Sequence, residues 1–143
     1  MKWAISFLVL ALVLGSCSQQ GGGGGGDGGD GGDSGSGQVG IEIEGTWVLS
    51  SGGVTETLII TTTTFMIEDT GAVSGHMECS ITAYDENAKH IKMSVTSVSG
   101  AYSVVSIGTV WYVLYSKSGD TLYLGMGGSG YPTSTPYGPY TKS

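Results

Sequence analysis

The stretch MECSITAYDENAKHIKMSV (residues 77–95) decides the fold, because its hydrophobic residues recur at every second position. A period of two sends alternate side chains to opposite faces of a β-strand. The turn-forming sequence Asp85-Glu86-Asn87-Ala88 separates the two alternating halves. The stretch therefore predicts a β-hairpin with one face in the core. The residues predicted to face inward are Met77, Cys79, Ile81, Ala83, Ile91, Met93 and Val95.

Segments rich in the strand-forming residues Val, Ile, Thr and Tyr flank this hairpin on both sides. The remaining predicted strands are 44–49, 55–62, 64–67, 101–107, 109–115, 121–126 and 137–142, the last interrupted by Pro139. We expect a turn at 68–71 and a loop at 127–139, where Gly, Pro, Ser and Tyr predominate. No window longer than a few residues has the 3.6-residue period of a helix.

Short strands joined by turns place the chain in the all-β class, as a sandwich or a barrel. Sequential hairpins favour a small antiparallel up-and-down β-barrel of about eight strands over residues 41–143, closed by pairing the first strand with the last. A barrel of this size is just wide enough to be filled by side chains or to hold one small ligand. For this chain length we expect a filled or narrow interior.

The first 17 residues have the zones of a secretory signal peptide. Lys2 precedes an apolar segment, Trp3 to Leu14, that is too short to span a bilayer. The segment ends in Leu14-Gly15-Ser16-Cys17, which resembles the lipobox of bacterial lipoproteins. The resemblance implies that Cys17 becomes the first mature residue and carries diacylglycerol and a fatty acyl group such as palmitate. An uncleaved signal or a chance Cys is the alternative.

Residues 18–40 separate this signal from the predicted barrel and consist mostly of Gly, Asp and Ser. Such a composition predicts a disordered, flexible linker. Its Gly-Gly-Asp triplets resemble calcium-binding repeats, but their spacing is three residues and not nine. We therefore expect a tether between a lipid anchor and the domain. Ser18 after the Cys resembles the outer-membrane default, which places the protein in the cell envelope, on the outer membrane.

The charge balance limits the class of partner. Twelve acidic residues face five basic ones, all of them Lys, which gives a net charge of −7 and a pI near 4.4. Nucleic-acid binding depends on clustered Lys and Arg, so a nucleic-acid partner is not expected. Lipidation of Cys17 would leave Cys79 without a partner for a disulfide. We expect Cys79 to be a buried thiol, because it shares strand phase with Met77 and Ile81.

The Gly45-Thr46-Trp47 sequence and the final Tyr140-Thr141-Lys142 resemble the small lipocalin-like domains of bacterial lipoproteins. The resemblance implies that Trp47 lies across the barrel floor, and Trp47 and Trp111 are the candidates for floor or ligand contacts. The simpler alternative for Trp47 is a core aromatic residue. Full lipocalins have an Arg over this Trp, whereas this chain has none and offers Lys142 for that place.

Catalytic and metal-binding patterns are not found in the sequence. His76 and His90 have the opposite strand phase from their apolar neighbours, so both are expected to face solvent. Strand alternation separates Cys79 from His76 and Glu78, which argues against a zinc site. A nucleophile elbow and a phosphate-binding loop are also absent. We therefore expect no enzyme activity, metal or cofactor.

These observations leave two functions. The first is a membrane-anchored envelope lipoprotein whose lipocalin-like barrel binds a small hydrophobic ligand. The alternative is a non-enzymatic structural or protein-interaction module with a filled barrel. In the second case the outer face or the Tyr-rich loop from Tyr131 to Tyr140 would contact an envelope protein.

Overall fold

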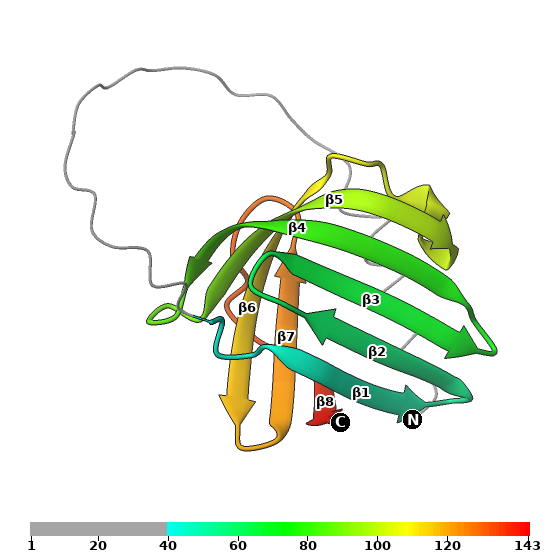
Figure 1. Cartoon of the computed structure of the whole chain (residues 1–143), viewed down its shortest axis with the longest axis horizontal. Helices are drawn as coiled ribbons and strands as arrows, with labels where there is room; N and C mark the ends of the chain where they lie inside the picture. Colours follow the sequence, from blue (N-terminus) through cyan, green and yellow to red (C-terminus); the bar gives the residue numbers. More distant parts are fainter. Residues whose placement is uncertain (1–39) are drawn as a thin grey trace.

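The computed structural model describes residues 40–143, whose strands form a closed antiparallel barrel (Figure 1). The strands are β1 (Gly45–Ser51), β2 (Val54–Ile60), β3 (Thr64–Gly71), β4 (Gly75–Asp85), β5 (His90–Gly100), β6 (Val110–Ser118), β7 (Thr121–Gly127) and β8 (Tyr137–Lys142). Each strand pairs with the next, and β8 closes the ring by pairing Lys142 with Trp47 and Thr141 with Val48 of β1. The predicted all-β, up-and-down barrel is confirmed. The predicted signal peptide, Cys17 and all of the linker except Gly40 lie outside the described residues.

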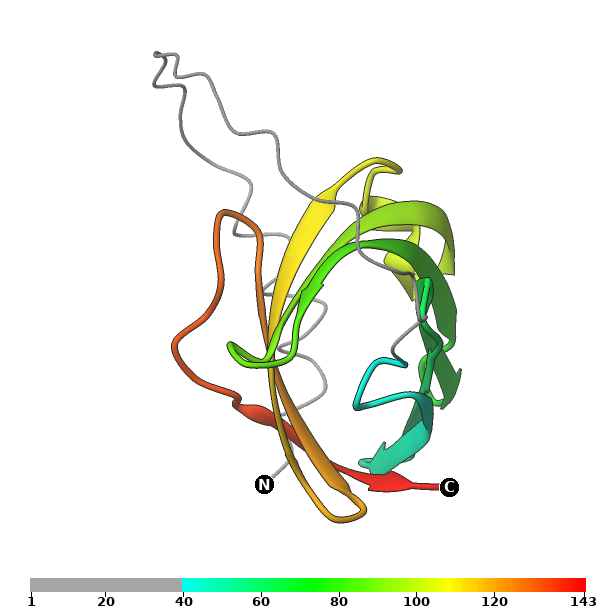
Figure 2. The same cartoon turned by 60° about the vertical axis from the view of Figure 1, so that its left-hand side comes forward.

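The core occupies the inside of this ring, which Figure 2 views from one end. Strand alternation produces it: along β2, Val54, Glu56, Leu58 and Ile60 are buried, and the residues between them are half-buried on the outer face. Inward-facing side chains from all eight strands meet in one cluster. Burial of this apolar area, at about 25 cal/mol per Å², is the main favourable contribution to folding.

Two β-bulges bend the long β4–β5 hairpin around the barrel. The register shifts between Glu78 and Cys79, where Thr96 of β5 has no partner, and again between Ile81 and Ala83, where Thr82 has none. Each threonine hydroxyl donates a hydrogen bond to a carbonyl of the facing strand, Thr96 to Glu78 and Thr82 to Lys92. Bulges of this kind increase strand twist and re-aim side chains.

The bulge at Thr82 reverses the alternation, so the predicted inward position of Ala83 is wrong. Ala83 is exposed, and the next residue, Tyr84, packs against the core instead. The prediction extended a strict period of two through the whole strand. A single unpaired residue changes the face of every residue that follows it.

Two further segments differ from the sequence prediction. Residues 101–107, predicted as a strand, contain the 3-10 helix η1 (Ala101–Val104) followed by a loop. Residues 68–71, predicted as a turn, continue β3 to Gly71, because all four pair with β2. The two differences have one consequence, since the extended end of β3 carries Asp69 to a position beneath η1.

A short segment closes each end of the barrel. At one end, the turn at residues 41–44 precedes β1 and buries Ile41 and Ile43 in the core. At the other end, η1 follows β5 and buries Tyr102. Figure 2 shows the first segment, in cyan, folded inside the ring of strands. We call these the N-terminal end and the η1 end.

Candidate functional site

The centre of the barrel is filled by side chains. Trp47, Leu58, Phe65, Met77, Ile91, Met93, Val113 and Leu122 have no exposed surface. Side chains that lined a cavity large enough for a water molecule would keep some exposed area. A filled or narrow interior was expected from the chain length, and the burial of these residues agrees with it.

Trp47 and Trp111, the two candidate floor residues, have different surroundings. Trp47 is fully buried, and its indole N–H donates to the carbonyl of Ile43 at 2.8 Å. The Lys142 ammonium lies 5.5 Å from the centre of the Trp47 ring, in the position that the sequence suggested for it. Trp111 faces the same way as Val113 but is only partly buried, and its indole nitrogen has no hydrogen-bond partner within the described residues.

Two carboxylates, Glu56 and Asp69, face the inside of the barrel at the η1 end. They are opposite each other on β2 and β3, and they keep only 4% and 3% of their surface exposed. Directly opposite Asp69 on the other side is Gly75 of β4, and a Cβ atom there would come within 2.8 Å of the Tyr102 ring. The glycine therefore leaves the space that the Tyr102 ring occupies.

Two tyrosines bind this carboxylate pair from different directions. Tyr102 of η1 donates its hydroxyl hydrogen to Asp69 Oδ2 at 2.9 Å, and Tyr140 of β8 donates to Glu56 Oε1 across β1. The second oxygen of Asp69, Oδ1, is buried and receives no hydrogen bond from these tyrosines. Within residues 40–143, no lysine or histidine reaches ion-pair distance of either carboxylate.

Burial without a cation raises the pKa values of both carboxyl groups. Loss of hydration is the largest cause for Glu56, whose pKa rises to about 7, and the nearby charge of Asp69 adds to it. The pKa of Asp69 also rises because of burial, while its hydrogen bond from Tyr102 acts in the opposite direction. The pair therefore retains one proton over much of the range in which exposed carboxyl groups are ionised.

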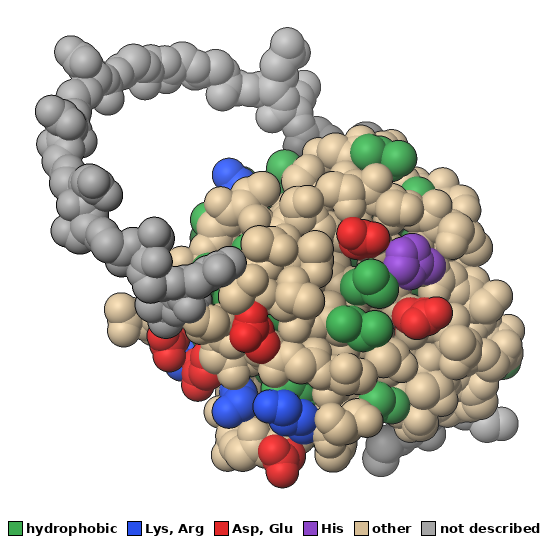
Figure 3. All heavy atoms as spheres, in the orientation of Figure 1, with side chains coloured by type: hydrophobic (Ala, Val, Ile, Leu, Met, Phe, Trp, Pro, Cys, Tyr) green, Lys and Arg blue, Asp and Glu red, His purple; other side chains and the backbone are tan. Residues whose placement is uncertain are grey.

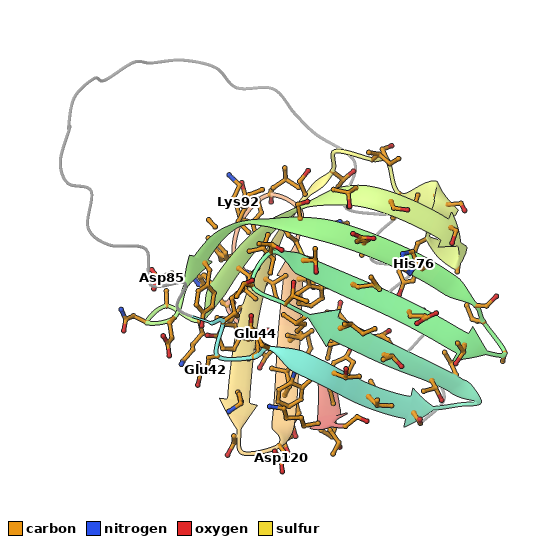
Figure 4. All side chains as sticks on the ribbon, in the orientation of Figure 1. Glu42, Glu44, His76, Asp85, Lys92 and Asp120 are labelled. Atoms are coloured by element: carbon orange, nitrogen blue, oxygen red, sulfur yellow. The ribbon has the colours of Figure 1, made fainter. Side chains whose placement is uncertain are left out.

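The N-terminal end also has a carboxylate between tyrosines, but here a cation is present. Glu42 Oε2 accepts hydrogen bonds from Lys89 and from the Tyr115 hydroxyl, and the Tyr115 hydroxyl contacts that of Tyr84 at 3.0 Å. The hydrogen bond from Lys89 is the main reason why the pKa of Glu42 is lowered. Figure 4 shows Glu42 at the end of the barrel where β4 reaches Asp85, with His76 towards the opposite end.

An aromatic surface lies on the outside of the barrel, over β5 and β6. We define it by His90, Lys92, Tyr112 and Tyr131. The Tyr131 ring stacks on His90 with centroids 3.7 Å apart, and it meets Tyr112 edge-on at 5.1 Å. The Lys92 ammonium lies 5.5 Å from the Tyr112 ring centre. Tyr131 remains 36% exposed.

Two glycines let the loop after β7 approach this part of the barrel. A Cβ atom on Gly125 would come within 2.0 Å of the Ser134 carbonyl, and one on Gly127 within 2.4 Å of the Gly130 carbonyl. Side chains at these positions would therefore push the loop away. The two glycines hold Tyr131 near β5 and β6, so that residues far apart in sequence form one surface.

The remaining candidate residues are spread over the barrel. Cys79 is a free, buried thiol, as expected, and its burial raises its pKa to about 12. His76 and His90 point outward, as expected, but both are half-buried. In Figure 3 the His side chain on the β1–β4 face lies among acidic and hydrophobic side chains. Among the described residues, no three His, Cys, Asp or Glu side chains are grouped as for a metal ion.

Sequence reasoning missed the carboxylate pair at the η1 end. Glu56 follows Val54 and precedes Leu58 at two-residue intervals, which is the signal that places it on the inner face. Asp69 stands in the same relation to Phe65 and Ile67, but residues 68–71 were predicted to be a turn. Asp and Glu are rarely buried without a partner, so an inward phase for either residue indicates a special environment.

Comparison with protein-family models, with curated proteins and with solved structures finds no match to this chain. In residues 40–143 there is no helix of the length and hydrophobicity that crossing a bilayer requires.

Proposed function

We propose that this chain is a lipid-anchored protein of the bacterial cell envelope whose barrel is a non-enzymatic module that binds an envelope protein. The observation that carries the proposal is the contrast between a filled interior and an assembled aromatic surface outside. The side chains at the barrel centre leave no space for a ligand, which argues against carriage of a small hydrophobic molecule. His90, Tyr112 and Tyr131 are held together on the outer face.

The chemistry of this surface suits protein recognition. Tyrosine offers a large, rigid contact area with a polar hydroxyl and loses little conformational entropy on binding. Lys92 supplies a cation at the edge of the aromatic residues. A protein segment with exposed apolar and acidic groups would complement this combination.

Lipid anchoring is tested by metabolic labelling of the full chain with a fatty-acid analogue in a bacterial host. We expect the labelled chain in the membrane fraction, because acyl chains provide about 0.8 kcal/mol per buried CH₂. Cys17→Ala should carry no label, because it lacks the thiol that is acylated. Mass spectrometry should find Cys17 as the first mature residue. An unlabelled mature chain that begins elsewhere would contradict the anchor.

The interaction is tested by photo-crosslinking on intact cells. A photoreactive residue replaces Tyr131 in the full chain, and the matched control carries it at Thr57, which points outward from β2. We expect a discrete crosslinked protein only at position 131, and its loss when Tyr112 is also changed to Ala. Equal products at both positions would argue against the proposed surface.

Small-ligand carriage, the competing function, predicts a different result. Native mass spectrometry of the full chain isolated from cells would show an added mass beyond the lipid anchor. We expect no such mass, because the buried side chains occupy the barrel centre. A co-purified apolar molecule that is lost in Trp111→Ala would favour ligand carriage over the proposal.

A further inference from the structure

We propose that the η1 end of the barrel is a proton-operated latch, in which one proton shared by Glu56 and Asp69 holds Tyr102 and η1 in place and its loss releases them. The inference concerns the conformation of the domain and does not rest on the proposed function. It follows from the hydrogen bonds around the two carboxylates and from the way η1, which we call the cap, is attached to the barrel. It also follows from the absence of a neighbouring cation among the described residues.

The Glu56–Asp69 pair has more carboxylate oxygens than tyrosine donors. The pair has four carboxylate oxygens, and the hydroxyls of Tyr102 and Tyr140 provide one donor to each carboxylate. Asp69 Oδ1 stays buried without a donor from these groups. A proton on Glu56, directly across the β2–β3 pair, supplies that donor and removes one of the two negative charges. In the monoprotonated pair the buried oxygen has a donor and only one negative charge is buried, so this is the form that the closed barrel end stabilises.

When Glu56 releases its proton to solvent, two like charges remain side by side in a buried site, and their desolvation is not compensated. The titratable groups that face this space are Glu56 from β2, Asp69 from β3, Tyr102 from η1 and Tyr140 from β8. Both tyrosines have raised pKa values because of burial, so they remain neutral donors. Hydration of the doubly charged pair then requires one of its covering groups to move.

Of the two tyrosines that cover the pair, Tyr102 is the one on the less firmly held segment. Tyr140 lies within a strand that pairs on both sides, with β7 and with β1. Tyr102 lies in a four-residue helix, which is held by the Ala101 N–H bond to the Ser74 carbonyl at 2.9 Å and by the packing of the Tyr102 ring. Val104 and Ile107 are 66% and 68% exposed, whereas Val105, directly after η1, packs into the core. Because η1 lacks the two-sided strand pairing of β8, it is the part of this end that opens more easily.

Two glycines, Gly75 and Gly100, allow η1 to pack closely against the barrel. A Cβ atom on Gly100, which has a φ of +61°, would come within 2.5 Å of the Ser74 carbonyl. Gly75 makes room for the Tyr102 ring, so the two glycines together allow η1 to lie close to the start of β4. The hydrogen bond from Tyr102 to Asp69 is the side-chain link from η1 into the barrel, in addition to the backbone bond from Ala101 to Ser74.

The test measures amide hydrogen exchange by NMR on the full chain between pH 5.5 and 8.5, corrected for the intrinsic rate. We expect protection of the Ala101 amide to fall by up to tenfold for each pH unit as the pH rises towards the transition of the pair, which lies near pH 7, and to level off above it. The Tyr115 amide, which bonds to the Lys89 carbonyl at the opposite end, should keep its protection. Constant protection of Ala101, or an equal loss at both ends, would overturn the latch.

Two variants separate the latch from general effects of pH. In Glu56→Gln, the side-chain amide donates to Asp69 and cannot lose its proton, so Ala101 should stay protected over the whole range. The matched control, Glu68→Gln, changes an exposed outward residue next to Asp69 and should behave like the unsubstituted chain. A pH-dependent loss of protection in Glu56→Gln would overturn the proposal.

A second measurement needs no substitution and remains decisive if Glu56→Gln does not fold. Carbon-13 labelling of the glutamate carboxyl groups in the unsubstituted chain follows their titration directly. We expect one glutamate to titrate near pH 7, together with the loss of Ala101 protection. Titration of every glutamate in the ordinary acidic range would overturn the latch.

Discussion

The two ends of the barrel are built from the same kinds of residue, and yet their carboxylates have opposite properties. At the N-terminal end, Glu42 accepts hydrogen bonds from Lys89 and Tyr115 near solvent, and its pKa is lowered. At the η1 end, Glu56 is buried next to a second carboxylate without a lysine, and its pKa is raised. A tyrosine hydroxyl stabilises a carboxylate at both ends. The difference shows that burial and the sign of the neighbouring charge outweigh one hydrogen bond.

The largest expected effect comes from removing the tyrosine that closes each end. Tyr102→Ala should lower the free energy of unfolding by about 4 kcal/mol, because it empties a buried aromatic site and leaves Asp69 without its donor. Tyr84→Ala should cost about half as much, since Tyr84 is only partly buried. Urea unfolding of the full chain measures both values.

Tyr102→Phe is the matched control for this first prediction. It keeps the ring in the space above Gly75 and removes only the hydrogen bond to Asp69, for an expected loss of about 2 kcal/mol. Similar losses for Tyr102→Ala and Tyr84→Ala would show that the two ends contribute equally to stability. The prediction that Tyr102 contributes more to stability than Tyr84 would then be wrong.

The second effect is the dependence of stability on pH. The folded state binds the Glu56 proton more tightly than the unfolded state, where the pKa is near 4.5. Its contribution is therefore fully present below pH 4.5 and is lost as pH rises through about 7, a decrease of about 3 kcal/mol. Urea midpoints across this window should fall in the unsubstituted chain and change much less in Glu56→Gln. A midpoint that rises with pH in both proteins would contradict the assignment.

The third effect is a smaller one of opposite sign at the N-terminal end. The lowered pKa of Glu42 stabilises the fold above the ordinary carboxyl pKa of 4.5, and this contribution is lost as pH falls through the folded value. Lys89→Met should reduce this loss at acid pH and lower the urea midpoint at pH 7. High salt should shrink the difference between the two proteins, because the ion pair is partly exposed.

The backbone at position 89 makes this substitution a fair test. Lys89 has a φ of +59°, which disfavours methionine and lysine to a similar extent, so the change removes the charge without a new backbone cost. Lys117→Met is the matched control, because Lys117 is a distant charge that makes a minor contribution to Glu42. Equal effects of the two substitutions would show that the Lys89 contact has no special role.

The smallest expected effect concerns Lys142, which covers Trp47 near the N-terminal end. Lys142→Met should lower the free energy of unfolding by about 0.5 kcal/mol, the typical value of an exposed cation–π contact. Lys142→Arg keeps the cation and should preserve stability. Thermal unfolding followed by tryptophan fluorescence distinguishes the two variants, and an equal loss in both would argue that the lysine stem matters more than its charge.

Much of the fold could be predicted because strand alternation is a local property. The pattern around Met77 and Ile91 identified the central hairpin, and Trp47 and Lys142 come together as the two sequence motifs suggested. The alternation could not reveal the bulge at Thr82, since an unpaired residue is defined by the facing strand. The position of Tyr84 near Glu42 therefore could not be predicted from the sequence of β4 alone.

The candidate sites were harder to predict than the barrel. Glu56 and Asp69 are 13 positions apart, and each looks like an ordinary carboxylate on a Thr-rich segment. Their importance depends on facing each other in the β2–β3 register and on η1 covering them. The outer aromatic surface likewise requires the loop after β7 to bring Tyr131 to His90.

The amino-acid sequence by itself determined the strand pattern, the acidic charge, the buried thiol of Cys79 and the closure of the first strand on the last. The strand pattern, the charge and the buried thiol follow from composition and from periodicity over a few residues, and the closure follows from the order of the hairpins. The tertiary structure alone decided which carboxylate is stabilised by a cation and which must keep a proton. That difference depends on dielectric surroundings and neighbouring charges, and both are created only when segments distant in the chain come together.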